Sequence, residues 1–420
     1  MDSYLLELRI GYARWRLKQN IDHITNKFHL TKESPEVPHL SLYGSFSLNS
    51  GYSIRDIKRK VEKVAKKYDK LPYFINGWEN RKSSHGGVIV HKIDPSNELK
   101  QFTIEVVNEL LQITTPKNNF DYHPENAWFH STLAFRLNDS QYDQILRYLS
   151  VQSPGILASI FKILSNPASP GKGNIRGVYL PVDGLRVTIL HNSLIAAEYD
   201  FTSKRWLDRA DAKSSRQFGI TLKNYRINQG IELKSPKYHQ DPTIFTIGDL
   251  HLKHANIINY CSRPFPFNQV HEMDQVIIKN WNYTVKPEDY IFFIGDLCCT
   301  FDKKLPEQML KMLNGHITFI EGNHDEGTTI PNKIPYHIHN YHGIDFLFTH
   351  YPEPKYIPNG FNGWIIHGHT HNNNLKKHPF FDPNNKRVNV GAELIKYQPI
   401  PLKYIYDLIK TNSGTLRYLE

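Results

Sequence analysis

Cysteine and long apolar runs are both scarce in this chain of 420 residues. Its three cysteines are Cys261, Cys298 and Cys299, and the last two are adjacent, so a fold built on disulfides is not expected. No apolar run approaches the roughly 20 residues that a membrane span requires. The first residues also lack the basic and then apolar pattern of a secretory signal. We therefore expect a cytoplasmic protein without membrane contact.

Acidic residues are in deficit only in the first half of the chain. Residues 1–240 contain 34 Lys and Arg against 23 Asp and Glu, whereas residues 241–420 contain 17 against 18. A basic region of this kind can hold a polyanion such as nucleic acid. Much of the excess lies in residues 55–70, however, where a solvated basic helix would explain it equally well.

A change in composition separates two predicted domains. Residues 235–242 contain two prolines and several polar residues between a basic segment and the apolar run 244–247, as expected of a linker. We therefore predict one domain over residues 1–236 and another over residues 241–420. A second stretch rich in Pro, Gly and Ser, residues 165–177, is interpreted as an insertion within the first domain.

The first domain shows a faint internal duplication. Residues 39–48 and residues 130–136 alternate as strands do, and a helical pattern follows each of them. The other predicted elements are strands at 178–180, 185–190 and 194–201, with a turn at 181–184. The pattern indicates an α+β domain.

The two duplicated strands each carry a histidine followed two residues later by a hydroxyl. His39 and Ser41 share one face of the first strand, and His130 and Thr132 share one face of the second. Two imidazoles and two hydroxyls around one phosphate suit hydrolysis of a phosphodiester. One histidine would take a proton from the nucleophile while the other protonates the leaving oxygen. The alternative is a pair of ordinary core or surface histidines.

These segments resemble the two-histidine phosphoesterase superfamily, which includes 2′-5′ RNA ligase-like proteins and 2′,3′-cyclic nucleotide phosphodiesterases. The resemblance covers about residues 1–235 and implies a two-lobed α+β fold whose two motifs face a central cleft without a metal. It implies that His39 and His130 are the acid–base pair, in either order, and that Ser41 and Thr132 bind the phosphate. Serine at position 41 departs from the commoner threonine but keeps the hydroxyl.

The second domain is predicted to alternate strands and helices. The predicted elements are a strand at 243–248, a helix at 269–282, a strand at 290–295, a helix at 304–313 and a strand at 316–321. Such alternation is typical of a layered α/β domain.

Aspartate and histidine follow five apolar, strand-like runs in this second domain. The segments are Gly248-Asp249-Leu250-His251, Gly295-Asp296, Gly322-Asn323-His324-Asp325, His350 and Gly368-His369-Thr370-His371. Side chains at strand ends converge at one edge of an α/β sandwich. Asp and His donors suit Mn, Fe or Zn better than calcium, which prefers oxygen donors only. A structural zinc site would need a closed set of four ligands, usually including cysteine.

Five such elements in this order resemble the calcineurin-like metallophosphoesterases, over about residues 243–402. The resemblance implies a four-layer α/β/β/α sandwich with two divalent ions, for which manganese is favoured over iron, zinc, nickel or magnesium. It assigns the first ion to Asp249, His251, Asp296 and His371, and the second to Asp296 as bridge, Asn323, His350 and His369. It makes His324 the proton donor to the leaving oxygen and Asp325 the residue that orients it. His367 would compete with His369 only in a shifted register, and we interpret it as a neighbour of the ligands or a substrate contact.

Two phosphoester-cleaving sites on one chain predict consecutive reactions. The leading interpretation is RNA 3′-end healing, in which the first site opens a terminal 2′,3′-cyclic phosphate to a 2′-phosphate and the second removes that phosphate. The partner would be RNA with either of these ends, or a small nucleotide, and the sequence does not indicate which proteins, if any, bind the chain. Aromatic residues near the first site could stack an end base, although core packing would account for at least half of them. They are Tyr43, Phe46, Tyr122, Trp128 and Phe129.

Three alternatives stay open. The substrate could be a small cyclic nucleotide or dinucleotide instead of RNA. The first domain could be a silent RNA-binding module that delivers substrate to a metal-dependent phosphatase or nuclease. The first site could also run in reverse as a 2′-5′ ligase, with no Gly-x-x-x-x-Gly-Lys loop for nucleotide activation in the sequence.

Overall fold

The computed structural model describes residues 2–31, 35, 37–83, 86–152, 178–237 and 239–411. The chain divides into two units, Met1–Thr221 and Leu222–Glu420. This division falls within helix α6 (Ser215–Asn228), ahead of the Pro-rich segment, so the domain boundary at residues 236–241 stays a prediction. Residues 165–177, the predicted insertion, lie outside the described residues.

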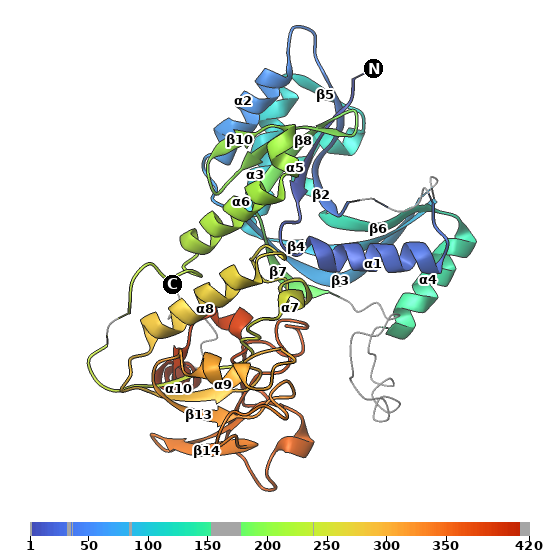
Figure 1. The fold of residues 1–420 in the computed structure, drawn as a ribbon. Helices are drawn as coiled ribbons and strands as arrows, with labels where there is room; N and C mark the ends of the chain where they lie inside the picture. Colours follow the sequence, from blue (N-terminus) through green and yellow to red (C-terminus); the bar gives the residue numbers. More distant parts are fainter. Residues whose placement is uncertain are drawn as a thin grey trace. The chain divides into compact units, whose positions relative to one another are not determined.

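Unit 1 contains two antiparallel sheets within its described residues (Figure 1). The six-stranded sheet has the order β10 (Arg205–Leu207), β9 (Leu194–Asp200), β8 (Arg186–His191), β1 (Tyr4–Arg9), β2 (His39–Leu48) and β5 (Thr114–Pro116). The four-stranded sheet has the order β6 (His130–Leu137), β4 (Gly86–Pro95), β3 (Leu71–Ser83) and β7 (Tyr179–Gly184). The two duplicated segments of the sequence are therefore β2 and β6, one in each sheet.

Helices pack against both sheets of unit 1. They are α1 (Arg14–Lys27), α2 (Ile54–Ala65), α3 (Asn97–Leu111), α4 (Asp139–Gln152), α5 (Arg209–Lys213) and α6, with short 3₁₀ turns η1 (Asn119–Tyr122) and η2 (Pro124–Asn126). Residues of α2 and α3 share a core with Leu40 and Leu42 of β2. Residues of α1 and α4 share a core with Leu133 of β6, and Figure 1 shows these two helices along the four-stranded sheet. Because side chains alternate, the motif histidines lie on the faces opposite these two cores, and on the six-stranded sheet α6 packs against part of that face through Thr221, which bonds Arg186 and Asp200.

The turn predicted at 181–184 is wrong. These residues belong to β7, where Pro181 pairs with Phe74 and Gly184 pairs with Leu71 of β3. Proline is tolerated because β7 is an edge strand of its sheet, so the missing N–H interrupts no ladder on the outer side. The helix predicted after residues 39–48 is α2, and Ser53 and Asp56 form a reciprocal capping box at its start.

Unit 2 also contains two sheets in its described part. One has the order β13 (His316–Ile320), β12 (Tyr290–Ile294), β11 (Ile244–Ile247) and β19 (Ile400–Pro401). The other has the order β14 (Tyr336–Tyr341), β15 (Ile344–Thr349), β16 (Trp364–His367), β18 (Arg387–Asn389) and β17 (Phe381–Asp382). Its helices are α7 (Ala255–Tyr260), α8 (Val270–Thr284), α9 (Leu305–Leu310) and α10 (Leu402–Thr411), with η3 (Pro354–Tyr356) and η4 (Ala392–Ile395).

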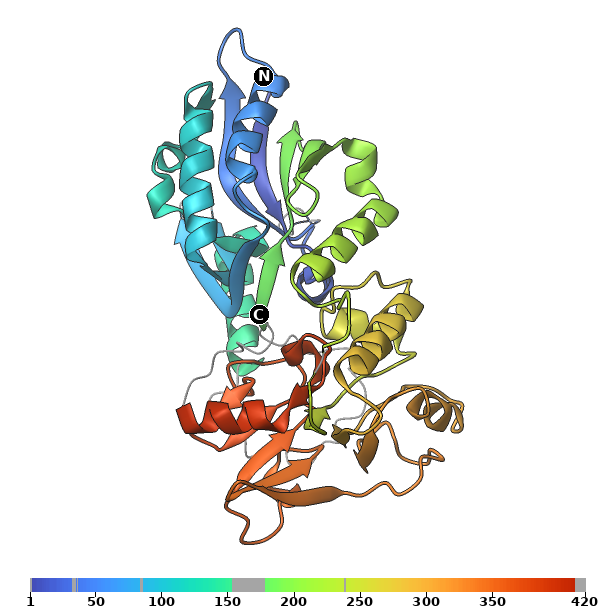
Figure 2. The same cartoon turned by 90° about the vertical axis from the view of Figure 1, so that its left-hand side faces the viewer.

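The strands of unit 2 that carry the motifs run parallel. Within one sheet β11, β12 and β13 are parallel, and within the other β15, β16 and β18 are parallel. The rings of Phe292 in β12 and Phe348 in β15 stack with centroids 4.1 Å apart, so the two sheets pack against each other. Helix α10, red in Figure 2, contacts β11 and β19. The loops that follow the parallel strands can therefore meet at one edge.

Candidate active sites

The two motif histidines of unit 1 are held in the same way. The strands that carry them, β2 and β6, contact each other although they belong to different sheets. The Nδ1 atom of His39 donates to the carbonyl of Val37 at 2.9 Å, and the Nδ1 atom of His130 donates to the carbonyl of Trp128 at 2.8 Å. Because a carbonyl can only accept, each neutral ring carries its hydrogen on Nδ1 and its lone pair on Nε2.

The two rings have different electrostatic surroundings. His39 Nδ1 lies 3.8 Å from the buried carboxylate of Glu7, whose own pKa is raised by burial. Burial lowers the pKa of His130, and the positive charges of His39 and Arg81 lower it further. A positive charge on His39 therefore disfavours a second one on His130. Burial disfavours a proton on His130.

The two hydroxyl residues lie beside their histidines. Ser41 is exposed on the same face of β2 as His39, and Thr132 is half-buried on the same face of β6 as His130. Their assignment as phosphate-binding groups stays a prediction.

Most of the aromatic residues predicted near this site belong to the core. Tyr43, Phe46 and Phe129 are buried in the core beneath the six-stranded sheet, and Tyr122 is exposed. The Trp128 ring alone among the five contacts a motif histidine, with its centroid 4.0 Å from that of His130.

The basic run at residues 55–70 is largely neutralised within unit 1. Lys60 and Lys63 of α2 both pair with Glu109 of α3, and Lys67 pairs with Glu105 of the same helix. Helix α2 is therefore a paired surface helix, as the alternative interpretation expected, and its lysines do not form an unpaired cationic patch.

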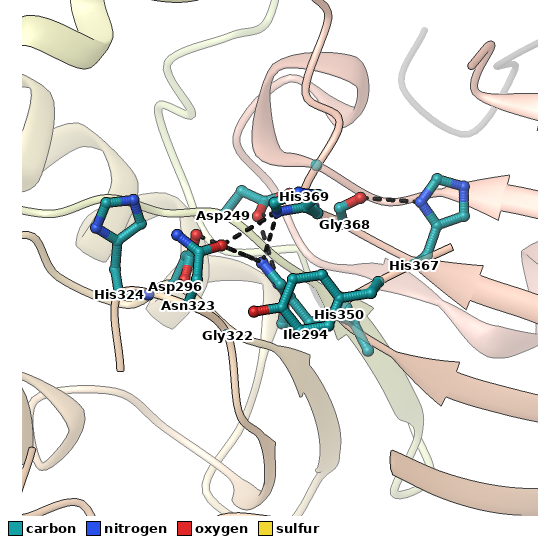
Figure 3. A network of polar contacts seen from close by, with 12 residues as sticks. Asp249, Ile294, Asp296, Gly322, Asn323, His324, His350, His367, Gly368 and His369 are labelled. Carbon is teal, nitrogen blue, oxygen red and sulfur yellow. Dashed lines mark hydrogen bonds and ion pairs between the residues drawn. The ribbon is translucent and has the colours of Figure 1, made fainter. Parts of the chain in front are cut away.

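The loops after the parallel strands of unit 2 gather the predicted ligands (Figure 3). Ligand atoms of Asp249, His251 and His371 lie within 4.8 Å of one another, and so do those of Asp249, Asp296 and His350. All five of these side chains are buried. Two acidic residues buried so closely together need positive charge to balance them.

A second convergence involves the remaining predicted ligands. Asn323 Oδ1 lies 3.2 Å from His350 Nε2 and 3.1 Å from His369 Nδ1, and the two histidine atoms are 3.2 Å apart. The Nδ1 atom of His350 donates to the carbonyl of Ile294 at 2.9 Å, so its Nε2 carries a lone pair. Figure 3 shows the three side chains directed at one another. Converging acceptor atoms of this kind suit a cation.

His251 provides a further test of whether a metal ion fits. Its side chain is only 2% exposed, yet neither ring nitrogen has a hydrogen-bond partner among the described residues. Burying both nitrogens without partners is costly unless something else binds them. Burial also lowers the pKa of His251, which keeps the ring neutral and able to coordinate. The residues present fit a divalent ion.

The backbone of the ligand loops is unusual. The left-handed region is occupied by Asp249, His251, Asp296, His369 and His371, with φ of 56°, 50°, 57°, 66° and 48°. Residues with a side chain adopt this region at a cost, and such positions concentrate at functional sites. The motif glycines have a different role, because a Cβ atom at Gly368 would lie 2.5 Å from the Asp249 carboxylate.

Two residues that sequence reasoning missed connect the ligand loops. The His371 Nδ1 atom lies 3.2 Å from Oε2 of Glu393, and Glu393 pairs with the buried Arg263 at 2.6 Å. Arg263 also donates to the carbonyls of Asp249 and Leu250, at 2.8 and 2.7 Å. The ion pair therefore holds both the first ligand loop and the last ligand histidine. Neither Arg263 nor Glu393 lies in a motif. The only signal that the sequence offers for them is that each is a charged residue within an otherwise apolar segment.

Asp325 does not make the contact expected of it. Its carboxylate accepts hydrogen bonds from the backbone N–H groups of Asp296, Leu297 and Gly322, and its pKa is raised to about 6 by burial and by Asp296. Among the described residues it makes no bond to the ring of His324. Asp325 therefore fixes the ligand loops and does not orient His324 directly.

The histidines around the cluster divide into two groups. The ring of His324 lies 5.0 Å from that of His251, which places it at the edge of the cluster. His367 instead turns its Nδ1 toward the carbonyl of Gly368, 2.9 Å away, and points away from the ligands in Figure 3.

Comparison with known proteins finds a different family in each half of the chain. The family model described as the 2′-5′ RNA ligase superfamily matches residues 13–162, and the model described as calcineurin-like phosphoesterase matches residues 242–402. The chain is a fusion of these two families. Both families act on phosphate esters, so the chain is a phosphoesterase, and its calcineurin-like domain is of a kind that binds divalent metal.

Individual relatives add little about activity. An uncharacterized protein of Methanocaldococcus jannaschii is 44% identical over 168 residues, which are 40% of this chain and 91% of that protein. A protein of unknown function from Aquifex aeolicus is similar in structure over 40% of this chain and 100% of its own, with 24% identity and a TM-score of 0.32. Usb1 of Kluyveromyces marxianus with uridine monophosphate covers 46% of this chain and 95% of its own, with 11% identity and a TM-score of 0.28. Both structural likenesses are too weak to support an argument. Within the described residues, no helix is long and apolar enough to cross a membrane.

Proposed function

We propose that this chain heals RNA 3′ ends in two steps, opening a 2′,3′-cyclic phosphate to a 2′-phosphate and then removing that phosphate. The observation that carries the proposal is the matched fixation of His39 and His130, which leaves two Nε2 atoms available at neighbouring strands. A silent binding module has no need of two imidazoles fixed in this way. The metal-ligand cluster of unit 2 supplies the second activity.

In the first step we assign His130 as the base and His39 as the acid. The lowered pKa of His130 keeps its Nε2 unprotonated, so it can take a proton from an attacking water molecule. As the new P–O bond forms, the bond from phosphorus to the ribose 3′ oxygen breaks. His39, whose Nδ1 lies 3.8 Å from the Glu7 carboxylate, gives a proton to that oxygen, and a 2′-phosphate and a 3′ hydroxyl result.

In the second step the residues of unit 2 act on the monoester. Asp249, His251, Asp296 and His371 would hold one divalent ion, and Asn323, His350 and His369 would hold the other with Asp296 between them. Such ions, manganese being the first choice, neutralise phosphate charge and activate water. His324 would protonate the leaving ribose oxygen, which gives a 2′,3′-diol and inorganic phosphate.

An end-group assay tests this division of labour. An oligonucleotide ending in a 2′,3′-cyclic phosphate is incubated with the full chain and manganese, and should yield a diol end. With a chelator, or with Asn323→Ala or His324→Ala, the 2′-phosphate end should accumulate instead. Persistence of the cyclic end under these conditions would contradict the order of the two steps.

Two other functions make different predictions. If unit 1 were only a silent RNA-binding module, His39→Ala would leave opening of the cyclic phosphate unchanged. If the substrate were a small cyclic nucleotide, turnover would depend only weakly on salt, whereas binding to an RNA chain weakens steeply as salt rises.

The finer description of the fold belongs to the same proposal. Two sheets in each unit support a two-lobed α+β domain followed by an α/β/β/α sandwich. We keep residues 1–236 and 241–420 as the two domains, and the cytoplasm as the compartment.

A further inference from the structure

A cavity of about 320 Å³ lies in unit 1 beside the segment that leads into β6. It is lined by residues of β3, β4 and α3, by η2 and by residues 127–129. Ligand pockets in proteins start at about this volume, which suits a group of the size of one nucleotide. None of the histidine or hydroxyl residues of the two motifs lines the cavity, but Trp128 and Phe129, two of the aromatic residues singled out from the sequence, do.

The cavity adjoins the second motif histidine through two of its lining residues. The Trp128 ring lies against that of His130, with centroids 4.0 Å apart. Lys92 is the cross-strand partner of His130, so both side chains extend from the same face of the four-stranded sheet. A group bound in the cavity would therefore be next to a phosphate held at His130.

The walls of the cavity combine an apolar side with a cationic one. The apolar side includes Ile93, Ile104 and Phe129, and the cations are Arg81, Lys92 and Lys100. This combination matches a nucleotide, which has a flat apolar face and an anionic phosphate. Two carboxylates also line the cavity, and each already has a partner: Glu79 pairs with Arg81, and Glu125 pairs with His123.

Two of the three cations already have partners. The Arg81 guanidinium lies 3.7 Å from the Trp128 ring and beside Glu79, and Lys92 pairs with Asp94 at 3.3 Å. Lys100, in the first turn of α3, has no carboxylate within ion-pair distance among the described residues. Lys100 is therefore the cation of the cavity that is available to bind a ligand phosphate.

We propose that this cavity binds the nucleotide on the 5′ side of the reacting RNA end, with its base on the apolar wall and its phosphate toward Lys100. The inference rests on the proposed opening of a cyclic phosphate at His39 and His130. It specifies the substrate further, because a free cyclic mononucleotide has no group to place there. The enzyme should thus distinguish an RNA chain from a mononucleotide at this site.

The test compares two substrates for the full chain in the presence of a chelator, so that only the first step is measured. One is uridine 2′,3′-cyclic phosphate, and the other is the dinucleotide of two uridines with the same cyclic end. We expect kcat/KM to be about tenfold higher for the dinucleotide, the value of one charge-assisted contact. In Lys100→Ala this ratio should fall toward one, and the salt dependence for the dinucleotide should become shallower by about 0.7 in log–log slope.

Two further variants separate the cavity from general charge effects. Ile104→Trp fills the cavity without changing charge and should also lower the ratio. Lys18→Ala removes a lysine of α1 that pairs with Asp22 outside the cavity, and it should leave the ratio unchanged. A ratio near one in the wild type, or an equal loss in Lys18→Ala, would overturn the inference while leaving cyclic-phosphate opening intact. Failure to open either substrate would instead refute the proposed function itself.

Discussion

Glu393 illustrates how a single residue outside the motifs can control a metal ligand. It contacts His371 Nδ1 and pairs with Arg263, and none of the three side chains is more than 10% exposed. We expect Glu393→Gln to weaken binding of the first ion by 10- to 100-fold, roughly the loss seen when such supporting carboxylates are removed. Manganese titration of the metal-free chain measures this directly, with Glu307→Gln on the surface of α9 as the matched control. Equal affinities in the two variants would show that Glu393 has no part in binding.

His91 makes unit 1 sensitive to acid. It is fully buried in β4, neither ring nitrogen has a partner among the described residues, and burial lowers its pKa from 6.5 to about 3. Between these pH values the unfolded chain binds a proton that the folded chain does not, so stability is complete above pH 6.5 and falls as the pH decreases.

His91→Phe should remove this acid sensitivity. One pKa unit corresponds to about 1.4 kcal/mol, so this residue alone costs about 2 kcal/mol at pH 5. The loss of stability between pH 7.5 and pH 5 should be smaller by about that amount in the variant. Pulse proteolysis in urea, following fragments of unit 1, measures it, and the exposed His123→Phe should behave as the wild type does.

At the scale of elements, the ion pairs between α2 and α3 determine whether the lysines of α2 are available to bind RNA. Glu109 holds both Lys60 and Lys63, which lowers the pKa of Glu109. Glu109→Gln should release the two lysines, so RNA affinity at low salt should rise and the salt dependence should steepen by about 0.7 per lysine. The loss of folding stability should be at most about 1 kcal/mol.

Fluorescence anisotropy with labelled RNA at several salt concentrations tests this prediction. Glu98→Gln in the first turn of α3 is the control, since this carboxylate makes no ion pair with α2. An unchanged salt dependence in Glu109→Gln would mean that the lysines of α2 contribute nothing even when they are unpaired.

The elements that sequence reasoning predicted correctly are those with a local signal. Strand β2 follows from its alternation, and α2 follows from its apolar spacing and its cap at Ser53. The hairpin of β3 and β4 was not anticipated as part of the site, because Arg81 and Lys92 approach His130 only through cross-strand pairing. Likewise, Asp249 and His251 were recognisable from their motif, but Glu393 reaches His371 only in three dimensions. Contacts between residues that are far apart in the chain produce no periodic pattern, so they cannot be predicted from a single sequence.

At the scale of the whole molecule, the two activities should be separable. Each unit contains its own complete set of predicted site residues. A mixture of His39→Ala and Asn323→Ala chains should therefore convert cyclic ends to diol ends, with a transient 2′-phosphate that passes through solution. Quantifying the three RNA ends over time tests this. If the mixture forms no diol although each variant retains its other activity, the intermediate must pass directly between sites of one chain.

The left-handed backbone of the five ligand residues has a consequence beyond chemistry. At roughly 1 kcal/mol per residue, these conformations cost about 5 kcal/mol, which is similar to the entire stability of many small domains. Ions that engage the same side chains would hold this edge of unit 2 in place and raise its melting temperature. In a cell short of the divalent metal that this site binds, unloaded chains would open here first and be degraded sooner. The abundance of the protein, and not only its turnover, would then follow the supply of metal.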